Sequence, residues 1–177
     1  MKTTKQLKKL IYKLLLALLV ICLTYVVDHV SRATLGQDIA SSDTYLVLNI
    51  YDGDTIEVLM DGTPEKVRFI GVDTPETHKP NTPVQCYGPE ASDFTTSLLT
   101  GQRVRLLADA SSSNRDIYGR LLRYVVRASD DLDVNLELIR QGYSKAYLVF
   151  PHGRSQEFRD ASASAEAARV GLWSACD

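Results

Sequence analysis

The sequence YDGDTIEVLMDGTPEKVRFIGVDTPE, residues 51–76, decides the fold. Two turn signals, Asp52-Gly53 and Asp61-Gly62, separate runs that are rich in β-branched and other apolar residues. Runs of this kind, joined by tight turns, are typical of a β-meander. The predicted strands cover residues 45–51, 55–60 and 65–72.

The rest of the chain adds two strands and three helices to this meander. Pro89 stands where a first helical turn begins and Gly101 where that helix stops. Short strands with helices inserted between them do not fit a parallel βαβ sheet. We therefore expect a mainly β, α+β domain, a five-stranded barrel of the OB type with three helices packed against it. The further predicted strands are residues 103–108 and 121–127, and the predicted helices are residues 89–99, 134–140 and 156–170.

Length and composition favour one globular domain with an acidic body. The chain has 177 residues, of which 45% are apolar and 24% are charged. Residues 34–177 hold 14 of the 20 Lys and Arg but 21 of the 22 Asp and Glu. Such a body is a poor non-specific binder of nucleic acid, because that affinity comes mostly from cations that meet phosphates. Any phosphate chemistry here must rely on local arginines and a bound metal.

The N-terminus has the pattern of an export signal. Residues 1–13 are basic, and residues 14–27 form an uncharged run without a helix breaker. Cleavage after Ala33 would remove a signal peptide, whereas an uncleaved segment would anchor the chain in a membrane. Both alternatives place the body outside the cytoplasm, and a buried core helix is the remaining interpretation. The predicted parts are residues 1–33 as signal peptide or anchor, 34–44 as linker and 45–177 as the domain.

The three cysteines leave one candidate disulfide in the exported domain. Cys22 lies within the apolar run, so Cys86 and Cys176 remain in the exported part. An even number of cysteines in an oxidising compartment favours a bridge. We expect Cys86 and Cys176 to be bonded, with two free thiols as the alternative.

Carboxylates stand next to two of the predicted strands. Asp54 lies at the mouth of the first hairpin, and Asp73 follows the third strand. Such oxygen ligands suit Ca²⁺ or Mg²⁺, which take carboxylates, carbonyls and water. Strict alternation along the strand would put Asp73 on the face opposite Arg68. The two converge only if Gly71 bends the strand or Asp73 reaches back from the turn at Pro75.

Two arginines and a glutamate complete the set. Arg68 and Arg120 would each offer paired N–H donors to phosphate oxygens, with the greatest effect where charge builds up on the phosphorus. Glu76, three residues after Asp73, would orient a water molecule or take its proton. Each residue alone fits an ordinary turn, strand or loop position. As an ordered set they indicate metal-assisted hydrolysis of a phosphodiester bond.

This ordered set closely resembles the thermonuclease family, the staphylococcal-nuclease-like domains. The resemblance covers about residues 45–174. The motifs that carry it are YDGDT (51–55), RFIGVDTPET (68–77), DIYGRL (116–121), NLELIRQG (135–142) and GLW (171–173). The combination is highly specific, although each motif is short.

The resemblance implies an OB-fold barrel with three helices and a Ca²⁺-dependent enzyme that acts on both DNA and RNA. Family enzymes cut the 5′ P–O bond and leave 3′-phosphates. Asp54 and Asp73 match the calcium carboxylates, and Thr74 matches a ligand that binds through its backbone carbonyl. Calcium is therefore the cofactor that the resemblance implies.

The resemblance also implies roles for the remaining site residues. Arg68 and Arg120 match the two arginines that stabilise the transition state, and Glu76 matches the general base or water-orienting group. Tyr118 matches a residue that lines the nucleotide pocket, and Tyr147 is expected to be the other tyrosine of that pocket. These assignments are carried over position by position from the motifs.

The chain departs from the family's well-studied member around the pocket. That member has lysines there, and here Ile117 takes one such place. The acidic body and the pair Cys86 and Cys176 differ from it as well. These departures bear on substrate affinity more than on the chemistry.

Three functions compete for this sequence. The leading one is an exported, metal-dependent endonuclease, expected to act as a monomer. The second is a non-catalytic OB-fold module that binds nucleic acid and is tethered to the membrane, as OB barrels often bind single strands without cutting. The third, a structural domain on an anchor, leaves Arg68 and Arg120 unexplained. The filled catalytic positions favour the endonuclease.

Overall fold

The computed structural model describes residue 22, residues 43–77 and residues 82–176. Residues 43–177 form a compact unit of their own. The predicted signal peptide or anchor lies outside the described residues except for Cys22, and so does the predicted linker except for its last two residues. Within the described ranges, no helix has the length and apolar character needed to cross a bilayer.

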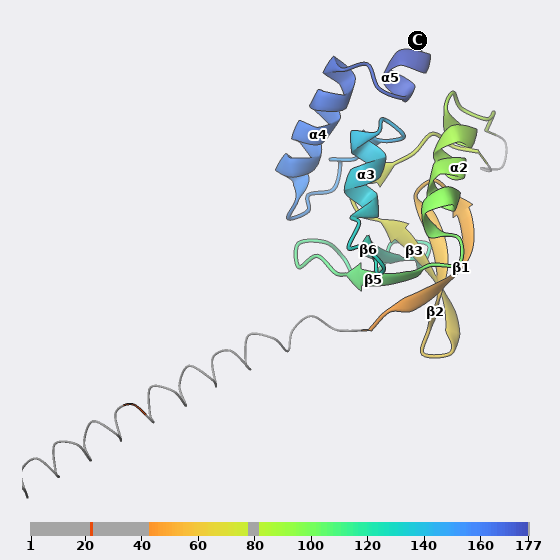
Figure 1. The fold of residues 1–177 in the computed structure, drawn as a ribbon, viewed down its shortest axis with the longest axis vertical. Coiled ribbons are helices and arrows are strands. Elements are labelled where there is room, and N and C mark those ends of the chain that lie inside the picture. Colours follow the sequence, from red (N-terminus) through yellow and green to blue (C-terminus); the bar gives the residue numbers. More distant parts are fainter. Residues whose placement is uncertain (1–21, 23–42, 78–81, 177) are drawn as a thin grey trace, which may run out of the picture. The chain divides into compact units, whose positions relative to one another are not determined.

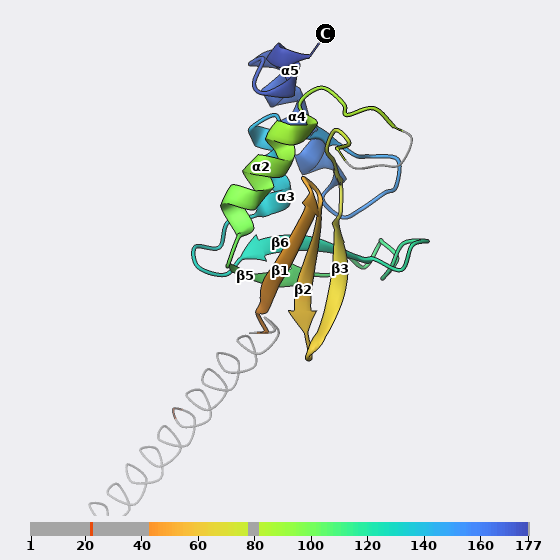
Figure 2. The ribbon, with the colours of Figure 1, turned by 90° about the vertical axis from the view of Figure 1, so that its right-hand side faces the viewer.

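A closed barrel of five strands is the centre of the domain (Figures 1 and 2). The strands close in the order β1-β2-β3-β6-β5. β3 and β6 run parallel, and every other neighbouring pair of the barrel is antiparallel. The predicted five-stranded barrel is therefore confirmed. Its strands are β1 (Tyr45–Asp52), β2 (Thr55–Met60), β3 (Thr63–Phe69), β5 (Arg103–Leu107) and β6 (Leu121–Arg127).

Three helices pack together on one side of this barrel, as predicted (Figures 1 and 2). A four-residue helix, α5, and a two-stranded sheet of β4 and β7 were not expected from the sequence. The helix predicted for residues 156–170 ends earlier, because Arg169 adopts a positive φ of 52°. The elements are α2 (Gly88–Leu99), α3 (Val134–Arg140), α4 (Ser155–Ala167), α5 (Leu172–Ala175), β4 (Val72–Asp73) and β7 (Lys145–Ala146).

The core lies between the barrel and these helices. Along β3, Val67 and Phe69 are buried while Arg68 between them is partly exposed, as the alternation of a strand requires. Leu138 from α3 and Phe158 from α4 are fully buried in the same cluster. Each such side chain stabilises the fold by roughly 1.5–3 kcal/mol. Arg68 thus projects from a strand whose opposite face is fixed by the core.

The prediction for the third strand is wrong at the C-terminal end of that strand. The sequence predicts one strand to residue 72, whereas β3 stops at Phe69 and a separate strand, β4, starts at Val72. Gly71 causes the break, with a φ of +71° that only glycine adopts without strain. A Cβ atom there would lie 2.6 Å from Nε2 of His152. The Nδ2 amide of Asn135 also donates to the Ile70 carbonyl at 2.9 Å and holds this turn.

A disulfide joins Cys86 and Cys176, with an S–S distance of 2.05 Å. Cys86 precedes α2, and Cys176 directly follows α5. The bridge spans a sequence separation of 90 residues. It therefore ties the segment that leads into α2 to the C-terminal end of the domain.

Candidate active site

The turn between β1 and β2 positions Asp54. Helix α2 holds this turn, because the Thr95 hydroxyl donates to the Gly53 carbonyl at 2.6 Å. Thr74 packs against its other side, where a Cβ atom on Gly53 would lie 2.7 Å from Cγ2 of Thr74. Only glycine allows so close an approach. Asp54 is consequently buried, with 1% of its surface exposed.

The buried Asp54 carboxylate accepts hydrogen bonds on both oxygens. Oδ1 accepts from the Thr55 hydroxyl at 3.0 Å and from the Arg68 guanidinium, and Oδ2 accepts from the Thr74 backbone N–H at 3.0 Å. Burial nevertheless raises the pKa of Asp54 to about 6, and the nearby charge of Asp52 adds to this while Arg68 opposes it. Additional positive charge next to Asp54 would stabilise the ionised form of this buried carboxylate.

Arg68 bridges the two carboxylates that the sequence predicted as metal ligands. One guanidinium nitrogen pairs with Asp54, and the other lies 2.7 Å from Oδ1 of Asp73. The same nitrogen donates to the Val72 carbonyl at 3.0 Å. The turn at Gly71 therefore rotates Asp73 to the side of Arg68, which resolves the conflict with strict alternation.

Asp73 is fixed by its backbone and left open at its side chain. Its N–H donates to the Ser144 hydroxyl at 2.9 Å, and β4 pairs Asp73 with Lys145 of β7. The side chain of Asp73 is 55% exposed. Its carboxylate can thus meet solvent, an ion or a ligand while the backbone stays in place.

Arg120 reaches the same cluster from the loop before β6. The parallel pairing of β3 and β6 brings the start of β6 beside the second half of β3, where Arg68 lies opposite Leu122. Arg120 donates from Nη1 to the Thr55 hydroxyl at 3.4 Å, and that hydroxyl in turn donates to Asp54. Thr55 therefore links Arg120 to the buried carboxylate.

Asp116 orients Arg120. Its Oδ2 accepts from Nε of Arg120 at 2.7 Å, and its Oδ1 accepts from the Arg120 backbone N–H at 2.9 Å. Burial alone would raise the pKa of Asp116, but these hydrogen bonds and the Arg120 charge lower it. Nη1 of Arg120 faces Thr55, where it can donate to a phosphate.

Glu76 lies near enough to Asp52 for its charge to act on that carboxylate. The pKa of Asp52 is raised, first by burial and then by the charge of Glu76. The Thr74 hydroxyl donates to Asp52 at 3.4 Å, which connects this pair to the backbone beside Asp54. The Glu76 N–H donates to the side-chain oxygen of Gln85 at 2.9 Å. A half-buried carboxylate in this position can accept a proton from water at the site.

The two predicted pocket tyrosines differ in their placement. Tyr118 is 78% exposed and lies next to the Arg120 guanidinium, 5.4 Å from it. Tyr147 is half-buried after β7, and its ring neighbours Phe150 at 6.0 Å. Among the described residues, ring contacts pair Tyr147 with Phe150 and not with Tyr118.

The cluster suits a hard cation bound partly by water. The charges of Asp52, Asp54 and Asp73 act on Arg68, and Glu76 adds a fourth carboxylate beside Asp52. Negative charge therefore exceeds positive charge around Arg68, and all the donors are oxygens, as Ca²⁺ and Mg²⁺ prefer. Within the described residues, no three Asp, Glu, His or Cys side chains are placed to hold a metal by themselves. A cation here would depend on Asp54, Asp73, a backbone carbonyl and water.

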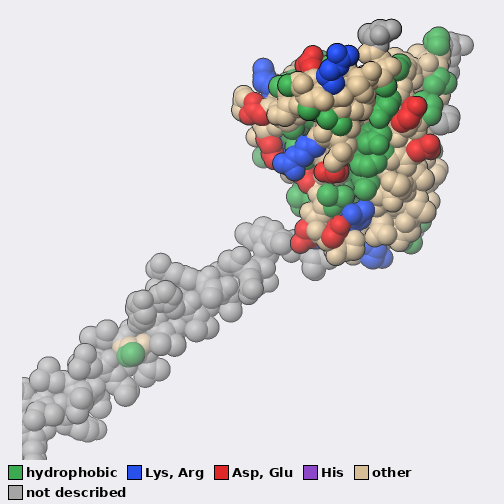
Figure 3. Space-filling model, turned by 45° about the horizontal axis from the view of Figure 1, so that its top comes forward, with side chains coloured by type: hydrophobic (Ala, Val, Ile, Leu, Met, Phe, Trp, Pro, Cys, Tyr) green, Lys and Arg blue, Asp and Glu red, His purple; other side chains and the backbone are tan. Residues whose placement is uncertain are grey.

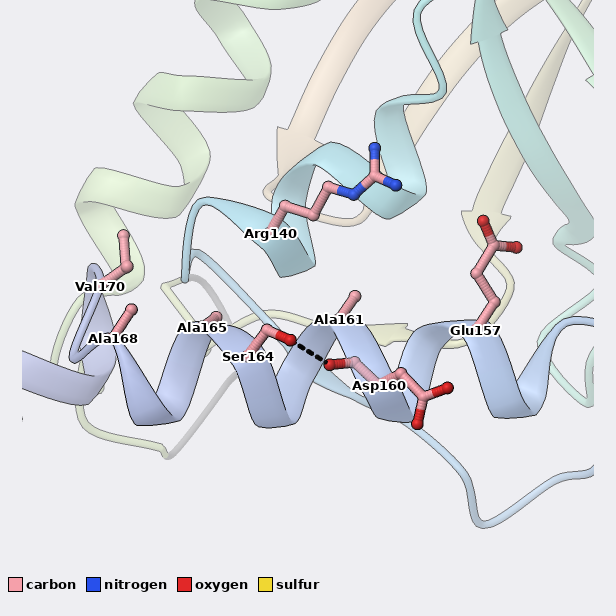
Figure 4. Close-up of a pocket in the computed structure, with 8 residues that line it drawn as sticks. All are labelled: Arg140, Glu157, Asp160, Ala161, Ser164, Ala165, Ala168 and Val170. Atoms are coloured by element: carbon pink, nitrogen blue, oxygen red, sulfur yellow. Dashed lines mark hydrogen bonds between the residues drawn. The ribbon is translucent and has the colours of Figure 1, made fainter.

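Charge on one face of the molecule is mixed. On the face that Figure 3 shows, Lys and Arg side chains are scattered among Asp and Glu and do not gather into a basic patch. A surface hollow of about 590 Å³ lies along α4, lined by residues such as Arg140, Glu157 and Asp160 (Figure 4). It includes none of the predicted site residues. Arg68 and Arg120 are cations at the carboxylate cluster itself that a phosphate there can contact.

Sequence reasoning missed the residues that hold the site together. Ser144, Gln85 and Asp116 each fix the backbone or side chain of a predicted site residue, and Thr95 fixes Gly53, which precedes Asp54. Asp116 could have been found, because it stands four residues before Arg120 in a turn motif. The other three lie far in sequence from their partners or across a loop, and no local pattern marks them.

Comparison with known proteins gives a consistent family. A profile of the Staphylococcal nuclease homologue family matches residues 66–175. The chain is 40% identical to the thermonuclease of Staphylococcus hyicus over 159 residues, which is 89% of this chain and 92% of that protein. It is 43% identical to the thermonuclease of Staphylococcus intermedius over 132 residues, covering 74% and 76% of the two chains.

A relative from another genus is similar as well. Endonuclease YncB of Bacillus subtilis (strain 168) is 38% identical over 125 residues, covering 70% of this chain and 58% of that protein. The profile covers Arg68, Asp73 and Arg120 but starts after Asp54, whereas the match to the Staphylococcus hyicus thermonuclease covers 89% of this chain. The chain therefore belongs to the staphylococcal nuclease homologue family.

Proposed function

We propose that this chain is an exported, calcium-dependent endonuclease that hydrolyses phosphodiester bonds of DNA and RNA and leaves 3′-phosphate ends. The observation that carries the proposal is the placement of Arg68 between Asp54 and Asp73, with Arg120 joined to the same carboxylate through Thr55. Oxygen donors for a cation and guanidinium donors for a phosphate thus share one site.

Sequence similarity to named nucleases supports hydrolysis of phosphodiester bonds as the reaction. Relatives named thermonuclease match most of this chain, and a relative named endonuclease matches its domain. Together with family membership and the filled site positions, they make this chain a nuclease, that is, a hydrolase. The excess of acidic residues in residues 34–177 fits a nuclease that binds its substrate at a local site.

Each site residue has a role in this reaction. Asp54, Asp73 and the carbonyl of Thr74 would hold calcium. The bound calcium would supply positive charge to the phosphate. Glu76 takes the proton of the attacking water or orients that water. These groups act from the carboxylate side of the site.

The arginines and tyrosines act on the nucleotide. Arg68 and Arg120 donate N–H groups to the phosphate oxygens, where negative charge increases in the transition state. Tyr118 lies in the open beside Arg120, a position suited to contact with a sugar or base. Tyr147 is proposed to line the other side of the nucleotide pocket.

Export is part of the proposal. The basic and apolar pattern of residues 1–33 supports a signal peptide or a membrane anchor. The Cys86–Cys176 disulfide is of the kind that persists in oxidising, extracytoplasmic compartments. We propose that the domain acts as a monomer, secreted or anchored with the nuclease outside. An anchored form would contact the membrane through the N-terminal segment.

A digestion assay tests the function. Labelled single-stranded DNA, double-stranded DNA and RNA are incubated with the full chain in calcium, and in parallel with a chelator. We expect cleavage only with calcium, and 3′-phosphate ends on the products. The Arg68→Ala/Arg120→Ala double variant controls for a contaminating nuclease. Binding without cleavage in calcium would contradict the proposal and favour a binding module.

A further inference from the structure

We propose that Gln85 is a positioning residue for Glu76, and that the Cys86–Cys176 disulfide holds Gln85 in that position. The inference rests on the proposed function, in which Glu76 handles the proton of the attacking water. It adds a dependence of activity on the oxidation state of the bridge. Four observations around Glu76 support it.

Gln85 binds both backbone polar groups of Glu76. The Glu76 N–H donates to the Gln85 side-chain oxygen at 2.9 Å, and the Gln85 N–H donates to the Glu76 carbonyl at 3.0 Å. Glu76 belongs to no helix or strand, so no regular ladder fixes its backbone. This reciprocal pair of hydrogen bonds takes the place of such a ladder.

The start of α2 presses against the same backbone. A Cβ atom on Gly88 would lie 3.0 Å from the carbonyl oxygens of both Glu76 and Pro75. The Gly88 N–H also donates to the Gln85 carbonyl at 3.1 Å. The residues on the α2 side of Gln85 therefore keep it against Glu76.

The disulfide supports Gln85 through the adjacent residue. Cys86 is bonded to Cys176, whose N–H donates to the Leu172 carbonyl at 3.0 Å. Leu172 is buried, and its own N–H donates to the Gly142 carbonyl at 2.8 Å. The far end of the bridge is thus packed into the domain.

Aromatic packing also holds the segment that follows Cys86. The Tyr87 ring stacks on the Tyr143 ring at 5.5 Å, and Phe94 of α2 stacks on Tyr143 at 4.0 Å. Cys86 itself is exposed, so a reductant in solution can reach the bridge. Opening the bridge would release Gln85 from its link to Cys176 while leaving the aromatic stack in place.

The first experiment compares Gln85→Met with wild type in the full chain. Methionine keeps the length of the side chain but lacks the amide oxygen that accepts from the Glu76 N–H. We expect kcat to fall about 10-fold with KM changed less than about 2-fold, because a misplaced catalytic group affects turnover more than binding. Gln156→Met on α4, where Gln156 donates to Asp160, is the matched control and should retain full activity.

The second experiment removes the bridge. Cys86→Ser/Cys176→Ser should lower kcat by a similar factor, and adding Gln85→Met should lower it little further, because both changes act through one anchor. Dithiothreitol gives two electrons and two protons to the bridge, which becomes two thiols, while dithiothreitol becomes its cyclic disulfide. It should lower kcat of wild type and leave the serine variant unchanged.

Hydrogen exchange separates this inference from the proposed function. The Glu76 amide, followed by NMR without nucleic acid, should exchange about tenfold faster in Gln85→Met and in the serine variant. The inference would be overturned if wild type cleaves nucleic acid and a folded Gln85→Met variant has the same kcat. If wild type does not cleave, the proposed function fails, and Glu76 exchange alone decides whether Gln85 positions it. Should the serine pair fail to fold, the kinetics and exchange of Gln85→Met decide the inference.

Discussion

The two arginines of the site are held in different ways. Arg68 lies on a barrel strand with its side chain 16% exposed, paired with an Asp54 side chain that is 2% exposed. Arg120 lies on a loop with its side chain 26% exposed, and its partner Asp116 is four residues away in the same loop. The first pair depends on the core, and the second depends mainly on its own turn.

Because of this difference, changes in the two halves of the site should affect the stability of the fold to different extents. The Asp54–Arg68 half buries charge and is supported by Thr95 and Thr74, so changes there affect the whole fold. The Arg120 half contacts the buried half through the Thr55 hydroxyl and can be altered with less structural damage. The Asp54–Arg68 half is thus preorganised by the barrel, whereas the Arg120 half is a local loop structure.

Replacing each arginine by alanine tests the comparison most strongly. Both Arg68→Ala and Arg120→Ala should lower kcat by about 10²-fold or more, because each removes a transition-state donor. Arg68→Ala should also destabilise the domain by about 3 kcal/mol, since it leaves Asp54 buried without its partner. Arg120→Ala should cost less than about 1 kcal/mol. Kinetics and urea unfolding measure the two effects, and equal loss of stability in both variants would contradict the comparison.

The two aspartates should respond to pH in opposite directions. Asp54 has a folded-state pKa of about 6, above its ordinary value of 3.8, so the folded state binds more protons between these values. Its contribution to stability therefore falls as pH rises from about 4 to about 6, by on the order of 2 kcal/mol in the calcium-free protein. Asp116 has a lowered pKa, so its contribution is lost as pH falls below its ordinary value of 3.8.

Urea unfolding between pH 3 and pH 7 in chelator-treated protein checks this prediction. Asp54→Asn should remove the fall in stability between about pH 4 and pH 6, and Asp116→Asn should remove part of the loss at the acid end. A stability profile that Asp54→Asn leaves unchanged would mean that Asp54 is ionised throughout this range.

The loop half can be weakened without touching an arginine. Asp116→Ala removes the acceptor that orients Nε of Arg120, and should lower kcat about 10-fold with little change in stability. Asp130→Ala is the matched control, because Asp130, in the turn after β6, forms a similarly short pair with Arg127, at 2.6 Å. A similar loss of kcat in both variants would show that the effect is not specific to Arg120.

The smallest effect is expected at the exposed end of the loop. Tyr118→Ala should raise KM about 5-fold and leave kcat within about 2-fold, because stacking on a base contributes to binding and not to the chemical step. Leu107→Ala, which truncates a partly exposed residue of β5, serves as the control. A fall in kcat without a change in KM would instead place Tyr118 in the support of Arg120.

Much of the fold follows from local patterns. The turn at Asp61-Gly62, where both residues have positive φ, and the alternation of Val67, Arg68 and Phe69 were readable from the sequence. Gly71 was identified as a residue that could bend its strand, but the pattern could not show that it splits β3 from β4. The split depends on His152 and Asn135, which approach Gly71 and Ile70 from distant parts of the chain.

In the candidate site, too, some residues could be identified from sequence motifs and others only from the structure. The motifs named the carboxylates, both arginines and Glu76, because these residue types at these spacings have a distinct chemistry. They did not name Gln85 or Ser144, since a single glutamine or serine carries no such pattern. The contacts of these two residues exist only after the loops have been brought together.

By itself, the sequence determined which side chains can bind a cation, contact a phosphate and accept a proton, and which short segments form strands and helices. Only the tertiary structure decided that Asp54, Arg68, Asp73 and Arg120 meet at one place. The physical reason is that closure of the barrel with β3 parallel to β6, and the turn at Gly71, are long-range packing outcomes that no short stretch of sequence encodes.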